Sequence, residues 1–164
     1  MGDIALAVIG GTGVYKLADL HDVDTRNVQT RFGEPSGPIR IGTLLGQRVA
    51  FLARHGEGHS VPPHLIKNRA NLAALKDIGA TRVLALNTVG GIGDAFGPRV
   101  LACPDQLIDY TWGRISTICE EPGTEVVHVD FGDPYTMLLR HKIIAAARVT
   151  GASLVEHGCY GATQ

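Results

Sequence analysis

Three short apolar segments, each followed by a turn of glycine and polar residues, constrain the fold of this chain most strongly. They lie at residues 4–9, 49–53 and 83–86, and each is uniformly apolar. Short runs of this kind are typical of strands buried on both faces of a sheet, which then needs helices to cover it. Residues 64–79 carry a helical pattern between the second and third runs. The sequence therefore predicts an α/β fold with a mixed, mostly parallel central sheet flanked by helices.

The helix expected over residues 64–79 carries start and stop signals. Pro62 and Pro63 precede it, and Gly79 stands where a helix commonly ends in a left-handed residue. Further elements follow the same patterns of periodicity. Strands are expected at residues 39–44, 126–129 and 153–156, a hairpin turn at Gly46-Gln47, and a second helix at residues 135–150.

The length of 164 residues predicts a single domain, since domains average about 150 residues. Residues 158–164 leave a strand without a covering helix, so the chain looks cut short at its carboxyl end. We therefore expect one domain over residues 1–164 with its C-terminal part missing.

Charge and cysteine content exclude several classes of function. Fifteen Lys and Arg against sixteen Asp and Glu give a net charge of −1, which disfavours nucleic acid and membrane surfaces as partners. The amino terminus lacks the pattern of a signal peptide. Three widely spaced cysteines suit a reducing compartment better than a disulfide framework. A cytoplasmic location is expected.

Glycine and polar residues at the strand ends are suited to binding an anion. Residues 10–13 (Gly-Gly-Thr-Gly) offer backbone N–H groups and a hydroxyl, although a tight exit from the strand explains them equally well. Asn87 and Thr88 follow the run at 83–86. Because parallel strands end at one edge of a sheet, the three turns are expected to converge there.

Arg54 and His55 follow the run at 49–53 and are the most specific of these signals. Arginine offers a rigid set of donors that matches phosphate oxygens, and histidine adds another donor or a proton. His55 and His59 have the spacing of zinc ligands on a helix, but Gly56 and Gly58 disfavour a helix there, and the adjacent arginine would repel a cation. We expect phosphate and no metal.

Five stretches, in order along the chain, resemble the trimeric purine nucleoside phosphorylases, nearest to the methylthioadenosine and methylthioinosine phosphorylases. They are residues 10–13, Arg54-His55-Gly56 with His59, residues 68–76 (Asn-Arg-Ala-Asn-Leu-Ala-Ala-Leu-Lys), residues 87–91 (Asn-Thr-Val-Gly-Gly) and residues 128–131 (His-Val-Asp-Phe). The resemblance implies a nucleoside phosphorylase-like fold and reversible phosphorolysis in nucleoside salvage. Phosphate attacks C1′ of a 5′-methylthio purine nucleoside and releases the free base and 5-methylthioribose 1-phosphate.

The resemblance also implies roles for single residues. The expected phosphate ligands are Thr12, Arg54, His55, Asn87 and Thr88, and the expected nucleoside contacts are Val89, Gly90, His59 and His128. His128 would reach the active site of a neighbouring subunit in a homotrimer. Inorganic phosphate is the co-substrate, and neither a cofactor nor a protein nucleophile is expected.

Chains of the family extend past the point where this one ends. The resemblance therefore places the catalytic residues beyond Gln164, and it leaves open whether residues 1–164 alone are active. It also leaves open whether the purine carries a 6-oxo or a 6-amino group, although the amino-acid sequences of residues 89–91 and 128–131 are closer to the methylthioinosine branch.

Two other functions remain as alternatives. Residues 52–57 (Leu-Ala-Arg-His-Gly-Glu) also resemble the strand of the histidine phosphatases and phosphoglycerate mutases, in which His55 would attack phosphorus. That strand normally comes first in the chain, whereas about fifty residues precede it here. The second alternative is a catalytically inactive binding subunit that keeps the phosphate half of the site.

Overall fold

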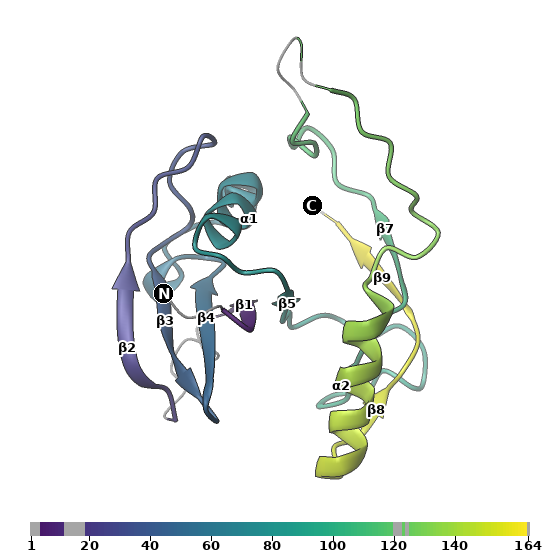
Figure 1. Cartoon of the computed structure of the whole chain (residues 1–164). Helices are drawn as coiled ribbons and strands as arrows, with labels where there is room; N and C mark the ends of the chain where they lie inside the picture. The colour runs from purple at the N-terminus through teal and green to yellow at the C-terminus, as the bar shows by residue number, and fades with distance from the viewer. Residues whose placement is uncertain (1–3, 12–18, 120–122, 124, 164) are drawn as a thin grey trace. The chain divides into compact units, whose positions relative to one another are not determined.

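The computed structural model of the 164-residue chain describes residues 4–11, 19–119, 123 and 125–163. The chain divides into two compact units, Met1–Thr88 (the first unit) and Val89–Gln164 (the second unit), and each is described by itself. The first contains β1 (Leu6–Gly10), β2 (His21–Arg26), β3 (Ile39–Leu44), β4 (Gln47–Ala53), the 3₁₀ turns η2 (Glu57–His59) and η3 (Pro63–Leu65), α1 (Asn68–Asp77) and β5 (Val83–Ala85) (Figure 1). The second contains β6 (Leu101–Ala102), β7 (Gln106–Asp109), α2 (Met137–Thr150), β8 (Leu154–Val155) and β9 (Cys159–Ala162). The expectation of one domain over residues 1–164 stays a prediction.

The first unit is built on a five-stranded sheet in the order β2-β3-β4-β1-β5. In this sheet β1 pairs in parallel with β4 and β5, whereas β3 pairs antiparallel with β2 and β4. In the second unit β6 pairs with β8 and β7 with β9, both in parallel. Among the described residues four of the six strand pairs are parallel, and the predicted α/β class with mixed, mostly parallel pairing is confirmed.

The two faces of β1 and β4 both lie in the core of the first unit. One face contributes Ile9 and Leu52 to a cluster with Leu75 of α1, and the other packs Val8 against Phe51. Figure 1 shows α1 beside the sheet in this unit. Successive side chains of a strand point to opposite faces, and here both faces are buried. This explains why the apolar runs of β1 and β4 contain no polar residue.

Helix α1 is shorter than its sequence pattern predicts. The helix was expected from His64, but Pro63 begins the short 3₁₀ turn η3 and Ile66 then takes an extended conformation, so that α1 starts only at Asn68. Its end agrees with the prediction, because Gly79 follows with a φ of +93°. Only part of its apolar residues pack on the sheet: Leu75 is fully buried, whereas Leu72 is 52% exposed.

The other predicted elements are confirmed in part. The hairpin between β3 and β4 turns through Leu45 and Gly46, both with positive φ as a two-residue turn requires. The strands expected at 83–86 and 153–156 and the helix expected at 135–150 are present with slightly shorter bounds. The strand expected at 126–129 is wrong, because this segment pairs with no strand of the described chain and its side chains are exposed.

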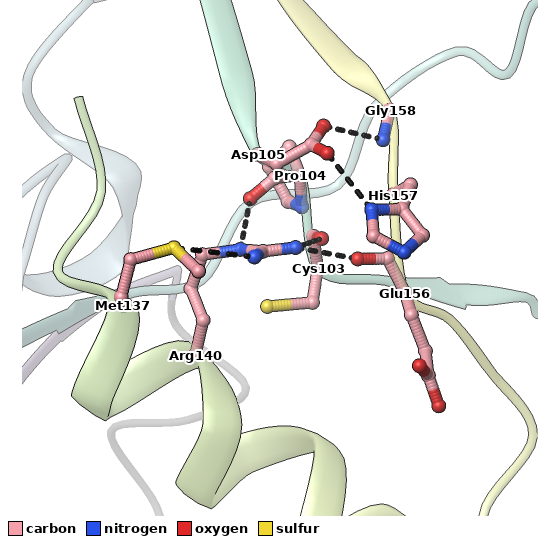
Figure 2. A network of polar contacts seen from close by, with 8 residues as sticks. All are labelled: Cys103, Pro104, Asp105, Met137, Arg140, Glu156, His157 and Gly158. Atoms are coloured by element: carbon pink, nitrogen blue, oxygen red, sulfur yellow. Dashed lines mark hydrogen bonds and ion pairs between the residues drawn. The ribbon is translucent and has the colours of Figure 1, made fainter. Parts of the chain in front are cut away.

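A buried arginine holds the second unit together. Arg140 of α2 is only 6% exposed, and its guanidinium donates to the carbonyl oxygens of Pro104 (3.0 Å), Cys103 (3.2 Å) and Glu156 (2.5 Å) (Figure 2). The first two carbonyls follow β6 and the third follows β8. One side chain therefore ties the helix to the segments that follow both strands of a parallel pair.

A carboxylate makes a second connection between the same segments. Asp105 accepts hydrogen bonds from the Gly158 backbone N–H (3.0 Å) and from His157 Nδ1 (2.8 Å) (Figure 2). These two contacts, the backbone one first, lower the pKa of Asp105 to about 2. Because its pKa is lowered, the carboxylate stabilises the fold above the ordinary titration range, and that contribution is lost as the pH falls toward about 2.

Replacing Arg140 with alanine is expected to destabilise the second unit far more than replacing Arg148. Arg140→Ala leaves three carbonyl groups without their charged donor, at a cost of about 2–3 kcal/mol. Arg148 lies on the same helix and pairs with Glu156 at 2.7 Å, but its side chain is 70% exposed, so its loss should cost about 0–1 kcal/mol. Hydrogen exchange of the backbone amides of Cys103 and Tyr110 measures both effects. Equal loss of protection in the two variants would contradict this role of Arg140.

Candidate functional site

The predicted convergence of strand ends is confirmed for the described backbone of the first unit. The Arg54 N–H donates to the Gly10 carbonyl (3.0 Å), and the Leu86 N–H donates to the Ile9 carbonyl (2.8 Å). The parallel ladder therefore continues one residue past β4 and past β5. Arg54, Gly11 and Asn87 consequently leave the sheet at the same edge.

Gly56 shapes the turn that follows β4. It has a φ of +69° and a ψ of 178°, a region that essentially only glycine adopts. A Cβ there would lie 2.7 Å from Ser60 Oγ and 2.9 Å from the Ser36 carbonyl oxygen. The Gly56 N–H donates to the Ala53 carbonyl (3.1 Å), which closes the turn directly behind Arg54 and His55.

The His55 side chain is held on three sides. Its Nδ1 lies 3.0 Å from the Val61 carbonyl oxygen, and its Nε2 accepts from Arg54 Nε at 3.5 Å. The ring of His59 stacks on it, with centroids 4.5 Å apart and planes 14° apart. Both Arg54 and His59 thus contact His55 in the structure. All three residues were singled out from the sequence.

His55 and His59 do not lie on a helix, so they lack the arrangement of zinc ligands one helical turn apart. The intervening turn η2 is a 3₁₀ turn interrupted by Gly58, whose φ of +65° lies outside any helix. Across the part of the chain that the structure describes, no group of three or more His, Cys, Asp or Glu side chains could hold a metal ion. In the same residues, no helix combines the length and the apolar character needed to cross a membrane.

Asn71 supports the turn after β4, and the sequence analysis named it only as part of the stretch 68–76. It is 2% exposed on α1, accepts a hydrogen bond from the Ser36 N–H (2.7 Å) and donates from Nδ2 to Ser36 Oγ (3.0 Å). Ser36 in turn packs against Gly56 through its carbonyl oxygen. A polar residue among the alanines and leucine of the buried helix face was the signal that could have identified it.

The remaining predicted ligands fall outside this cluster. Thr12 lies outside the described residues. Asn87 and Thr88 follow β5 and are exposed. Val89, Gly90 and His128 belong to the second unit, where all three are exposed. Their ligand-binding roles stay predictions.

Comparison with known proteins decides the family. Residues 5–164 match the family described as the phosphorylase superfamily. The chain belongs to this family. The resemblance to nucleoside phosphorylases is confirmed, and the chain is therefore not assigned to the histidine phosphatases that its Arg-His-Gly turn also resembles.

Individual relatives are similar over nearly the whole chain. A probable S-methyl-5′-thioinosine phosphorylase of Xanthomonas campestris pv. campestris is 76% identical over 98% of this chain and 64% of the relative. One of Pseudomonas syringae pv. tomato is 44% identical over 96% of this chain and 64% of the relative. The methylthioadenosine phosphorylase of Schistosoma mansoni in complex with adenine superposes with a TM-score of 0.89 at 29% identity, covering 97% of this chain and 64% of that one. The chain thus spans just under two thirds of the length of these relatives.

Gly56→Ala is expected to destabilise the first unit more than Gly58→Ala. Both glycines have positive φ, but only Gly56 has protein atoms within 3 Å of the position of a Cβ; Gly58 has none within 4 Å. Backbone strain should cost about 1–3 kcal/mol in each variant. It is larger at Gly56, whose ψ is 178°, than at Gly58, whose ψ of 17° lies in the left-handed helical region, and the contacts at Gly56 add to it. Urea unfolding measures the difference. A Gly58 variant that is as unstable as the Gly56 variant would show that the packing around Gly56 is unimportant.

Proposed function

We propose that the protein catalyses phosphorolysis of a 5′-methylthio purine nucleoside in the cytoplasm, in nucleoside salvage. The products are the free purine and 5-methylthioribose 1-phosphate. Inorganic phosphate is the co-substrate, and no further cofactor takes part. S-methyl-5′-thioinosine is the favoured substrate, and 5′-methylthioadenosine is the alternative.

The main observation behind the proposal is that the turn after β4 places the side chains of Arg54 and His55 together at the carboxyl edge of the sheet. A phosphate there would meet the guanidinium donors of Arg54 and an imidazole nitrogen of His55, close to the backbone of Gly11 and Asn87. Carboxyl edges of parallel strands are where α/β proteins commonly bind ligands. The 76% identity to a relative named a probable S-methyl-5′-thioinosine phosphorylase supports the substrate.

The reaction needs these residues to place and orient phosphate. One phosphate oxygen forms a bond to C1′ while the bond from C1′ to the purine nitrogen breaks, and its electron pair leaves with the purine, which takes up a proton. Positive charge develops on the sugar in the transition state, and the bound anion stabilises it. Arg54 and His55 would fix the anion and replace part of its hydration, which lowers the entropic cost of attack.

The proposed reaction predicts a selective defect in Arg54→Ala. The wild-type full-length protein should consume S-methyl-5′-thioinosine only when phosphate is present. Loss of the charge-assisted contacts should raise the KM for phosphate about tenfold to a hundredfold and leave the KM for the nucleoside nearly unchanged. Arg26→Ala is the control, since Arg26 lies in the same unit and makes an ion pair with a half-exposed Asp24.

Two results would count against this assignment. Equal changes in both KM values would remove Arg54 from the phosphate site. Absence of phosphate-dependent turnover with either methylthio nucleoside would favour the inactive binding subunit instead.

We also propose that the protein forms a homotrimer in which His128 reaches the active site of a neighbouring subunit. The segment around His128 offers an apolar surface, with Val127 61% exposed, Val129 76% exposed and Phe131 56% exposed. Side chains of this size, exposed together, are typical of surfaces that another chain covers.

Analytical ultracentrifugation tests the trimer. The wild-type protein should sediment as a trimer at micromolar concentration, and Val129→Asp should shift it toward smaller species, because a carboxylate is costly to bury in an apolar contact. Val149→Asp is the matched control, since Val149 is 88% exposed on α2 and lies outside this segment. An active wild-type monomer would falsify the shared site.

A further inference from the structure

The contacts of His55 determine which of its ring nitrogens carries the proton. Nδ1 lies 3.0 Å from the carbonyl oxygen of Val61. A carbonyl oxygen only accepts hydrogen bonds, so Nδ1 must be the donor. A neutral imidazole carries a single N–H, and Nε2 is therefore left with an unprotonated lone pair.

The contact with Arg54 points to the same tautomer independently. Arg54 Nε lies 3.5 Å from His55 Nε2, and a guanidinium has only donors. Nε2 must accept in this contact, which again requires its lone pair. The distance is long for a hydrogen bond, since typical values are about 2.9–3.0 Å, so the lone pair remains available to a stronger donor.

The contact with the Val61 backbone is the shorter of the two that set the tautomer. The Val61 N–H donates to the His55 carbonyl at 2.8 Å, so residues 55 and 61 are joined in both directions. Gly56 allows the tight turn between them, and the stacked ring of His59 covers one face of the imidazole. The titratable or charged side chains on this stretch are Arg54, Glu57 and His59.

Building on the proposed phosphate site, we infer that His55 binds phosphate as a hydrogen-bond acceptor. Its Nε2 lone pair accepts from the one protonated oxygen of hydrogen phosphate, while Arg54 donates to unprotonated oxygens. The protonated oxygen is then fixed against His55, and the oxygen that attacks C1′ is one of the other three. No proton is transferred in this binding step.

This role makes the site selective among tetrahedral anions. Hydrogen phosphate and hydrogen arsenate carry an O–H group near neutral pH, whereas sulfate carries none. A sulfate oxygen would meet the Nε2 lone pair without a proton between them, which leaves both groups unsatisfied. Sulfate can bind equally well only where the ring takes up a second proton.

Nitrogen NMR of the histidine side chains tests the inference directly. At about pH 8, where an ordinary histidine is neutral, long-range proton–nitrogen correlation separates protonated from unprotonated ring nitrogens. His55 should show a protonated Nδ1 and an unprotonated Nε2 in the free protein. Inorganic phosphate should shift the Nε2 resonance without protonating it, and phosphate should bind at least about tenfold more tightly than sulfate. The missing resonances in His55→Asn assign the signals among the seven histidines.

Two variants separate the roles of the two nitrogens. In His55→Asn the amide takes the place of Nδ1 and can still donate to the Val61 carbonyl, but nothing replaces Nε2, so phosphate binding should weaken about tenfold. In His55→Gln the amide reaches the place of Nε2 and can present either its carbonyl oxygen or its NH₂. This variant should bind phosphate and sulfate with similar affinity.

The outcomes distinguish this inference from the proposed function. A proton on Nε2 in the phosphate complex, or equal affinity of the wild-type protein for phosphate and sulfate, overturns the acceptor role and leaves the phosphate site intact. If phosphate shifts no resonance of His55 and Arg54→Ala leaves the KM for phosphate unchanged, the phosphate site itself is wrong.

Discussion

Parallel pairing of β1 with β4 and β5 is the constraint on which the rest of the first unit depends. A strand that pairs on both edges and packs on both faces has no room for a polar side chain, so the polar groups can only follow it. Parallel direction then brings the ends of all three strands to one edge. Arg54 and Asn87 are neighbours of Gly11 for this reason and not because of any attraction between them.

Backbone carbonyl groups orient two side chains of the described chain, those of His55 and Arg140. The Val61 carbonyl contacts one ring nitrogen of His55, and the other ring nitrogen faces Arg54 at the longer distance of 3.5 Å. Three carbonyls surround Arg140 and engage two of its guanidinium nitrogens within the second unit. A carbonyl group carries no net charge and only accepts hydrogen bonds, so it orients each side chain without forming an ion pair. Arg140 thus uses its donors within the fold, whereas one ring nitrogen of His55 has no carbonyl partner among the contacts described above.

Asn71 shows how a helix far from the turn in sequence contributes to it. Its side chain satisfies both the N–H and the hydroxyl of Ser36, thirty-five residues away, and Ser36 limits the space at Gly56. A buried amide must have partners, so its position on α1 and the path of the loop at residue 36 depend on each other. The resemblance of residues 68–76 to a family motif thereby acquires a physical explanation in the first unit.

Much of the fold and part of the site could be predicted because they depend on local patterns. Uniform apolar runs identified the strands that contain Ile9, Leu52 and Leu84, and the glycine-rich turns after them marked the edge where these strands end together. The start of α1 was misplaced because a proline can open a helix or a 3₁₀ turn, and the choice depends on the residues that follow. The segment 126–129 has strand composition but lacks a partner in the described chain, and composition alone does not supply one.

The sequence by itself determined the family and the α/β class and singled out the Arg54-His55 pair, because these follow from residue types and their order. Only the tertiary structure decided how that pair is oriented. The proton position on His55 depends on the Val61 carbonyl, and the turn depends on contacts with Ser36. The burial of Arg140 depends on two other segments, at residues 103–104 and 156. These are contacts between residues that local patterns treat as independent, and they arise only when the chain is packed.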